Sequence, residues 1–354
     1  MTISPEPGRV PDTMQAIHMH QYGGPLVVET MPVPALGPTD VLVQMSATPL
    51  NPSDLMFIKG RYGLNKPVPV VPGLEGSGTI VAVGRAWWLR PWLGRRVACG
   101  APEDSDGTWA EYMRTSFHRC FFLADTVSNV QGATMIVNPL TAWALVEQVR
   151  KGNHRAAIQT AAASSLGQMI NRLMQRFKLP LINIVRREEQ VTMLKEQGAP
   201  YVLNSSAPDF ERQLGELSHQ IKATIALDAI SGQMTGQLLN AMPHTSEVIV
   251  YGALSEQAAM AHPGDLIFKH KRVRGFWLSD WIEQQTILGI IQTGTRVQQM
   301  LHTDLKTTVQ AGYPLAEIEQ AISHYKQQMS GGKVLLLPGL HRTNAVAYQE
   351  QAMQ

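Results

Sequence analysis

The chain has little of several features that would mark it as a particular class of protein. Its 354 residues include only two cysteines, Cys99 and Cys120, and neither belongs to a CxxC pair or a His/Cys cluster. Neither a disulfide framework nor a structural zinc lobe can be built from them. A reducing compartment fits this cysteine content best.

The chain also lacks an excess of one charge and any long apolar run. Its 30 basic and 28 acidic residues give a net charge of +2, with no Lys/Arg run that favours nucleic acid or a membrane surface. No stretch approaches the roughly 20 apolar residues of a membrane span. Residues 1–13 are polar and lack the apolar core of a signal peptide and the Arg-rich pattern of a transit peptide. We expect a cytoplasmic protein with a small-molecule partner.

The sequence has two parts with different patterns of residues. From Met14 to about Ser128, short β-rich runs alternate with Pro and Gly, which predicts an all-β domain. After Asn138, six apolar strands alternate with segments of helix length, which indicates a doubly wound parallel six-stranded sheet. The predicted strands are 155–161, 180–186, 201–204, 223–229, 246–252 and 273–278, and the predicted helices are 165–178, 188–197, 209–219 and 233–241. A helix-like segment at 280–301 precedes a last helix and strand within 311–338.

The first strand-to-helix turn of this sheet, "TAAASSLG" at 160–167, has one glycine where a dinucleotide-binding protein carries several. Small side chains also allow close backbone approach, and the hydroxyls of Ser164 and Ser165 can cap the helix or bond a phosphate. Together with Leu166 and Gly167 they form the candidate pyrophosphate site. The turn by itself also fits an ordinary buried turn; the six-strand context favours the cofactor site.

The second strand ends in Arg186 and Arg187, where NAD-binding proteins place an Asp or Glu for the ribose 2′-hydroxyl. A guanidinium matches a 2′-phosphate in charge and geometry, so this pair favours NADPH. The alternative is a solvated pair bonded to Glu188 and Glu189.

Several motifs, in order, resemble the medium-chain dehydrogenase/reductase superfamily over roughly residues 14–340. The stretches "NPSDLMFIKGRYGL", "PGLEGSGTIVAVG", "GTWAEY", "NPLTAW", "INIVRREEQ" and "RGFWLSDW" look most like the zinc-independent, mitochondrial-type 2-enoyl thioester reductases. The resemblance implies a GroES-like β domain of residues 1–130 and 305–345 and a Rossmann domain of residues 131–304, with residues 346–354 as a tail. It also implies a homodimer joined through edge strands of the Rossmann sheets.

Zinc-dependent members of that superfamily have a Cys and a His at two positions where this chain has Asn51 and Leu74. An amide and an aliphatic side chain cannot replace a thiolate and an imidazole, so no catalytic zinc is expected. The eleven histidines, such as His118, His244 and His270, are interpreted as surface or locally bonded residues without ligand spacing.

The resemblance assigns catalytic roles to three residues. Tyr62, in "GRYG", corresponds to the tyrosine whose phenol stabilises the enolate and helps protonation at the α carbon. Trp277, in "GFW", matches a tryptophan that lines the pocket and takes part in proton delivery. Asn51 would orient the substrate or a ribose hydroxyl. The plain alternative for Tyr62 is packing at a loop corner.

Further cofactor contacts follow from the resemblance and from the carboxyl edge of the predicted sheet. Lys333, or its neighbouring backbone, would reach the cofactor from the returning segment, whereas Asp228 is expected to cap or bond locally. The remaining predicted contacts are Asn138, Thr141, Tyr251, Gly252, Ala253, Phe276 and Leu278.

The leading hypothesis is an NADPH-dependent enzyme that reduces the C=C bond of α,β-unsaturated carbonyl compounds, with 2-enoyl thioesters as the best single substrate class. An NADPH:quinone or enone oxidoreductase shares the fold and stays open as an alternative. A second alternative is an NADPH-binding sensor or structural protein with little turnover.

Overall fold

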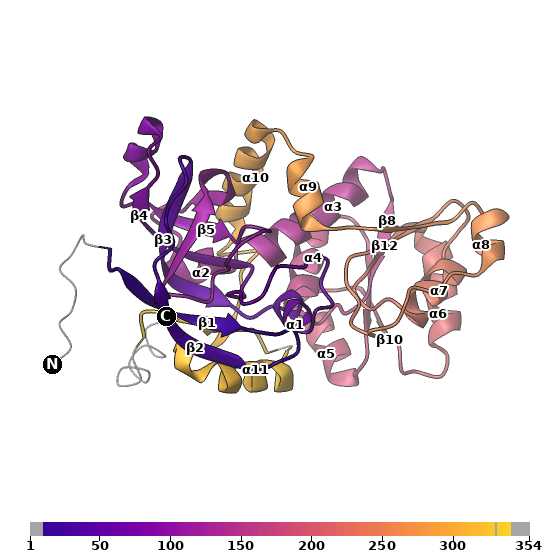
Figure 1. Ribbon diagram of the computed structural model, residues 1–354. Helices are drawn as coiled ribbons and strands as arrows, with labels where there is room; N and C mark the ends of the chain where they lie inside the picture. Colours follow the sequence, from indigo (N-terminus) through magenta and orange to yellow (C-terminus); the bar gives the residue numbers. More distant parts are fainter. Residues whose placement is uncertain (1–9, 330, 341–354) are drawn as a thin grey trace. The chain divides into compact units, whose positions relative to one another are not determined.

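The computed structural model describes residues 10–329 and 331–340 (Figure 1). The chain forms two compact units, here called the β unit (Met1–Val137 with Thr307–Gln354) and the Rossmann unit (Asn138–Lys306). The predicted boundaries, at 130/131 and 304/305, lie near these divisions. The predicted tail, 346–354, and the first nine residues of the polar start lie outside the described residues.

The β unit contains the β-rich texture that the sequence predicts. Its larger sheet has seven strands in the order β14-β15-β3-β4-β5-β7, with β6 also paired to β3, and β1 and β2 form a separate antiparallel pair. The strands are β1 (Thr13–Met19), β2 (Leu26–Pro32), β3 (Asp40–Pro49), β4 (Glu75–Val83), β5 (Arg96–Gly100), β6 (Tyr112–Ser116), β7 (Cys120–Phe122), β14 (Val309–Tyr313) and β15 (Lys333–Leu336). The α-helices are α1 (Pro52–Ile58), α2 (Asn129–Ala133) and α11 (Ile318–Gln327).

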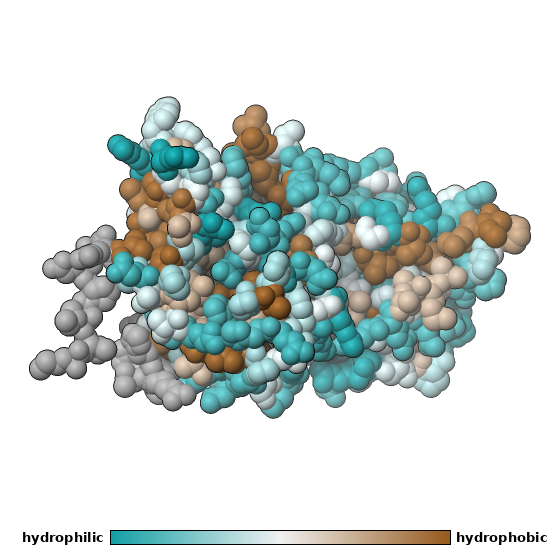
Figure 2. All heavy atoms as spheres, viewed as in Figure 1, coloured by the Kyte–Doolittle hydropathy of each residue, from teal (hydrophilic) through white to brown (hydrophobic). Residues whose placement is uncertain are grey.

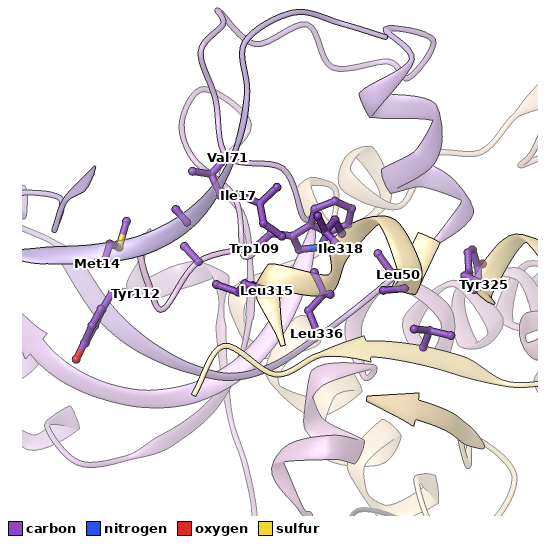
Figure 3. Packing of buried hydrophobic residues seen from close by; sticks show 14 of the residues in the cluster. Met14, Ile17, Leu50, Val71, Trp109, Tyr112, Leu315, Ile318, Tyr325 and Leu336 are labelled. Carbon is purple, nitrogen blue, oxygen red and sulfur yellow. The ribbon is translucent and has the colours of Figure 1, made fainter. Parts of the chain in front are cut away.

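The returning segment completes the core of the β unit (Figure 3). Ile17 and Trp109, from the first part of the chain, are fully buried and share a cluster with Ile318 of α11 and Leu336 of β15. Burying an aliphatic side chain of this size contributes roughly 1.5–3 kcal/mol. The last strand and helix are therefore part of this unit's core.

The Rossmann unit contains the predicted six-stranded parallel sheet, in the order β10-β9-β8-β11-β12-β13. The strand order reverses between β8 and β11, the place where such sheets bind ligands at their carboxyl ends. The strands are β8 (Ala156–Gln159), β9 (Leu181–Val185), β10 (Tyr201–Asn204), β11 (Ala223–Asp228), β12 (Glu247–Val250) and β13 (Arg272–Gly275). The helices are α3 (Thr141–Lys151), α4 (Ser165–Arg176), α5 (Glu188–Glu196), α6 (Phe210–Ile221), α7 (Gln233–Ala241), α8 (Pro263–Ile267), α9 (Leu278–Glu283) and α10 (Ile287–Met300).

Two predicted elements end differently in the structure. The last predicted strand stops at Gly275, and Leu278 already begins α9. The helix-like segment at 280–301 is divided between α9 and α10, because the Thr286 hydroxyl accepts a hydrogen bond from the Gly289 N–H at 3.1 Å and starts a new helix. Among the described residues, no helix combines the length and the apolar character that a membrane crossing requires.

Candidate functional site

The turn between β8 and α4 has the close backbone approach that the sequence predicts. A Cβ atom added at Gly167 would lie 2.6 Å from the Ala161 carbonyl oxygen and 2.7 Å from the Cα of Ala162, so only glycine fits there without a backbone shift. Ala161 itself adopts a positive φ of 49°. The compact turn therefore uses a single glycine and an alanine in the left-handed region.

Ser164 caps α4, because its hydroxyl oxygen accepts a hydrogen bond from the Gly167 N–H at 3.0 Å. The first amide N–H groups of a helix have no carbonyl partner within the helix, so those of Ser165 and Leu166 can bind an anion. At twelve residues, α4 also presents a favourable dipole there. A pyrophosphate therefore fits at this helix start, where free backbone N–H groups are available and the Ser164 cap fixes the first turn.

Asp228, at the end of β11, bonds locally, as predicted. Its carboxylate accepts hydrogen bonds from the Thr160 hydroxyl at 2.9 Å, the Ile230 N–H at 2.9 Å and the Thr235 hydroxyl at 2.8 Å. The Thr160 hydroxyl oxygen in turn accepts from the Ala229 N–H at 2.8 Å. This network joins the ends of β8 and β11 and leaves Asp228 with a structural role.

Arg186 and Arg187 directly follow β9 and are exposed. Within residues 10–329 and 331–340, neither guanidinium forms an ion pair with Glu188 or Glu189. The Glu188 carboxylate instead accepts a hydrogen bond from the Asn204 amide at 3.1 Å. The pair is thus not a solvated ion pair with those glutamates, and its charge is available to a phosphate.

The other predicted cofactor residues of this unit lie at the carboxyl ends of its strands or at the starts of helices. The Tyr251 N–H donates to the Asp228 carbonyl, and a Cβ atom at Gly252 would lie 2.8 Å from the Ala229 carbonyl oxygen. The Tyr251 hydroxyl is buried without a hydrogen-bond partner among the described residues, and burial raises its pKa. Ala253, Phe276 and Leu278 follow β12 or β13, Asn138 lies in the π-helical turn Ile136–Leu140, and Thr141 begins α3.

A second polar cluster lies in the β unit and consists of Asn51, Asp54, Glu75 and Lys333, all at most 2% exposed. The Glu75 carboxylate accepts hydrogen bonds from the Asn51 side-chain amide at 2.9 Å and from the Ile136 and Val137 N–H groups at 3.0 and 2.8 Å. The Lys333 ammonium donates to the Asn51 side-chain oxygen.

Asp54 adds a second carboxylate to this cluster. It accepts hydrogen bonds from the Asn51 N–H at 2.8 Å and the Leu74 N–H at 3.0 Å. Burial raises the pKa of Asp54 to about 7 and also raises that of Glu75, while it lowers the pKa of Lys333. The ammonium and the carboxylates oppose these shifts by attracting one another. Asn51 and the Leu74 N–H, at the positions where the sequence predicts no zinc ligands, thus belong to a buried charged network.

The network engages the Lys333 side chain, because its ammonium is directed to Asn51 and the buried carboxylates within the β unit. The cofactor contact of Lys333, or of its neighbouring backbone, stays a prediction. The sequence reasoning missed Asp54 and Glu75, although Asp54 follows Asn51 at the spacing of a helix capping box.

Tyr62 and Trp277 lie in different units. Tyr62 follows α1, and its half-buried ring packs against the cluster formed by Met19, Phe57 and Val70. The alternative interpretation, in which Tyr62 packs at the corner of a loop, thus describes part of its environment. Trp277 is half-buried and precedes the first residue of α9. The catalytic roles of both residues stay predictions.

Two family models match the chain: an alcohol dehydrogenase GroES-like domain over residues 37–125 and a zinc-binding dehydrogenase over residues 165–293. Mitochondrial enoyl-[acyl-carrier-protein] reductase from Mus musculus is 31% identical over 289 residues, which span 77% of this chain and 74% of the relative. The Homo sapiens protein of the same name is 30% identical, with 79% and 75% of the two chains covered.

Solved structures agree in fold. A protein from Mesorhizobium loti, assigned as an NADPH:quinone reductase, is 36% identical and covers 93% of this chain and 100% of its own, with a TM-score of 0.86. The complex of Etr1p with NADP and crotonyl-CoA is 23% identical, with a TM-score of 0.76 and coverage of 92% and 99%, and shows the shared fold. The chain belongs to the zinc-independent medium-chain dehydrogenase/reductase superfamily, whose members are oxidoreductases.

Proposed function

We propose that this protein is an NADPH-dependent reductase of the C=C bond of α,β-unsaturated carbonyl compounds, and that 2-enoyl thioesters are its substrates. The observation that carries the proposal is the 31% identity to an enoyl-[acyl-carrier-protein] reductase over 77% of the chain. The lack of zinc ligands at Asn51 and Leu74 favours the same chemistry, because a conjugated carbonyl can accept hydride without a metal.

The Rossmann unit supplies a site that fits NADPH. The α4 N-terminus at Ser165 and Leu166 would hold the pyrophosphate, and the exposed Arg186 and Arg187 would hold the 2′-phosphate. Gly167 supports the fit, because the turn has no room for a side chain where the helix meets the strand. Bound NADPH supplies the hydride that the β carbon of the substrate receives.

The protein's own groups would then manage the charge that develops on the substrate. Hydride addition at the β carbon places negative charge on the carbonyl oxygen, and the Tyr62 phenol would donate a hydrogen bond to that oxygen. Proton transfer at the α carbon completes the reduction, with Tyr62 as the donor and Trp277 as part of the delivery path. The role predicted for Asn51, to orient the substrate or a ribose, would have to act through its neighbours, since its side chain is fully buried and bonded to Glu75 and Lys333.

A quinone or enone is the second candidate substrate class. The 36% identity to the Mesorhizobium loti protein favours it, since that protein is assigned as an NADPH:quinone reductase. A sensor with little turnover is a third possibility, and it predicts NADPH binding without reduction of either substrate.

The Tyr62 role is tested by Tyr62→Phe. Loss of one oxyanion donor typically lowers kcat by roughly 10²-fold, and we expect that loss for crotonyl-CoA reduction with NADPH affinity retained. Tyr201→Phe, a change of the same size on β10, is the control and should keep wild-type turnover. Equal turnover of Tyr62→Phe and the wild type would refute the assigned role.

We also propose a homodimer joined through β13, one of the two edge strands of the Rossmann sheet. Ile267 and Phe268, beside this strand in sequence, are 61% and 76% exposed, and Figure 2 shows brown, hydrophobic atoms in the region of α8. An exposed apolar surface at a free sheet edge favours pairing. A cytoplasmic location remains a prediction, since the named relatives are mitochondrial.

A further inference from the structure

A second cluster of potential ligands lies in the β unit on the β1–β2 pair. His18 is on β1 and His20 follows its last residue, so the alternation of an extended chain directs both rings to one side. Glu29 is on the antiparallel partner β2, opposite Ala16 and two residues from Val27, the partner of His18. Glu29 is therefore a diagonal neighbour of His18 across the pair.

The three side chains converge closely. His18 Nδ1 lies 2.6 Å from one carboxylate oxygen of Glu29, and His20 Nε2 lies 2.9 Å from the other. One potential ligand atom from each residue lies within 4.8 Å of the other two. The side chains of His18, His20 and Glu29 are 14%, 52% and 37% exposed, so an ion from solvent can reach the group.

We propose that His18, His20 and Glu29 form a surface binding site for Zn²⁺. Two imidazole nitrogens and one carboxylate oxygen are a common three-ligand set for zinc, and water would fill the fourth position. Mg²⁺ and Ca²⁺ prefer oxygen ligands, so two imidazoles disfavour them. The site is separate from the Asn51 and Leu74 positions, where no zinc is expected.

Binding requires a definite exchange of protons. In the metal-free protein with neutral rings, the N–H groups at His18 Nδ1 and His20 Nε2 donate to the Glu29 carboxylate. A metal ion needs lone pairs at those same atoms, so each neutral ring must carry its proton on the other nitrogen in the bound state. On binding, the Glu29 carboxylate loses its two N–H donors and gains the cation as its partner. Each neutral ring keeps its proton on the other nitrogen, so no proton is released.

This proposal departs from the expectation that the histidines lack ligand spacing. One intervening residue is the spacing that places two ligands on the same side of an extended strand. The third ligand comes from an adjacent strand eleven residues beyond His18, and only the hairpin register brings it into reach. Strand pairing therefore creates a ligand set that the sequence reasoning missed.

The test is zinc titration of the full-length, untagged protein against a chromogenic chelator. We expect the wild type to bind one zinc ion that His20→Ala and Glu29→Gln each bind at least 10-fold more weakly. His219→Ala, which removes an exposed histidine from α6, is the matched control and should leave this affinity unchanged.

Histidine side-chain ¹⁵N NMR provides a second readout that does not depend on stoichiometry. Zinc should shift the His18 Nδ1 and His20 Nε2 resonances and reverse the tautomer of any ring that began with its proton on those atoms. Thermal unfolding without zinc checks that the variants fold. Equal zinc affinity of the wild type, His20→Ala and Glu29→Gln, or no zinc-dependent change at these two rings, would overturn the proposal.

Discussion

The two units hold their polar groups in contrasting ways. At the carboxyl ends of its strands the Rossmann unit has backbone N–H groups, the Ser164 cap and the Asp228 carboxylate, and it leaves Arg186 and Arg187 exposed. Its buried ion pair, Asp265 with Lys271, comes before the start of β13. The β unit gathers buried charges of both signs in one polar cluster, in which Glu75 and Lys333 are at most 2% exposed. A site made of backbone N–H groups destabilises the fold little when no ligand is bound. In a buried charged network, removal of one member leaves its partners without compensation and lowers the stability of the fold.

This contrast separates two kinds of sensitivity to mutation. Substitutions in the β-unit network should act mainly on stability, because one lost partner leaves another charge buried without compensation. Substitutions at the exposed arginines should act mainly on ligand affinity, because solvent replaces the lost group.

Lys333→Met should lower the free energy of unfolding by about 3–5 kcal/mol, because Glu75 and Asp54 lose the buried cation that attracts both of them. Urea unfolding measures the loss. The double variant Lys333→Met/Glu75→Gln removes one of the stranded charges and should lose less than the sum of the two single changes. A loss below about 1 kcal/mol for Lys333→Met would contradict the role of the network.

Lys66 is a buried cation whose hydrogen bonds go to backbone carbonyls. Its ammonium donates to the Pro102 and Ser105 carbonyls at 2.7 Å, and burial lowers its pKa to about 8 from an ordinary 10.5. Between those values the unfolded chain binds more protons than the folded one, so stability rises with pH. Relative to Lys66→Met, the wild type should gain about 3 kcal/mol between pH 8 and 10.5.

Urea unfolding of both proteins at the two pH values gives this difference directly, and the titration of shared tyrosines and cysteines cancels. A difference that stays constant, or that falls as pH rises, would show that the folded protein does not disfavour the charged form of Lys66.

Gly167→Ala should lower the free energy of unfolding by about 2 kcal/mol and weaken NADPH binding, because the new methyl group would meet the Ala161 and Ala162 backbone. Gly215→Ala is the matched control. Apart from its chain neighbours and the nearby backbone of α6, no described atom lies within 4 Å of a Cβ at Gly215, so this change should stabilise the protein by up to about 1 kcal/mol. Thermal unfolding and NADPH titration check both, and effects of the same sign would contradict the packing argument.

Arg186→Ala combined with Arg187→Ala should weaken NADPH binding by about tenfold, or ~1.4 kcal/mol, with little effect on NADH. Fluorescence titration of both cofactors measures the ratio. Arg212→Ala removes an exposed arginine that pairs with Asp209 and Glu216, and it should change neither affinity. Equal loss for NADPH and NADH would disprove the 2′-phosphate assignment.

The fold of the Rossmann unit is easier to predict than the polar cluster of the β unit, because the residue patterns that specify its strands and helices lie within those elements. Buried strands such as Leu181–Val185 are continuous apolar runs, and a helix cap such as Ser164 lies beside the turn that it serves. Gly167 and the local bonding of Asp228 were predicted for the same reason. The helix break at Thr286 was missed, although a threonine cap can be recognised in sequence.

The β-unit network could not be predicted in this way because its partners are remote in sequence. Lys333 lies 282 residues beyond Asn51, and only the pairing of β15 with β3 brings the returning segment to it. The engagement of the Lys333 ammonium inside the β unit therefore has no local signal in the sequence. Similarly, the contact of Glu29 with His18 and His20 depends on hairpin register.

The central claim is the reduction of a 2-enoyl thioester with NADPH. The most direct measurement is NADPH oxidation by the purified protein, followed by the cofactor's absorbance, with crotonyl-CoA and a simple quinone offered in parallel. We predict turnover of crotonyl-CoA that exceeds turnover of the quinone. Turnover of the quinone alone, or tight NADPH binding without reduction of either compound, would contradict the account.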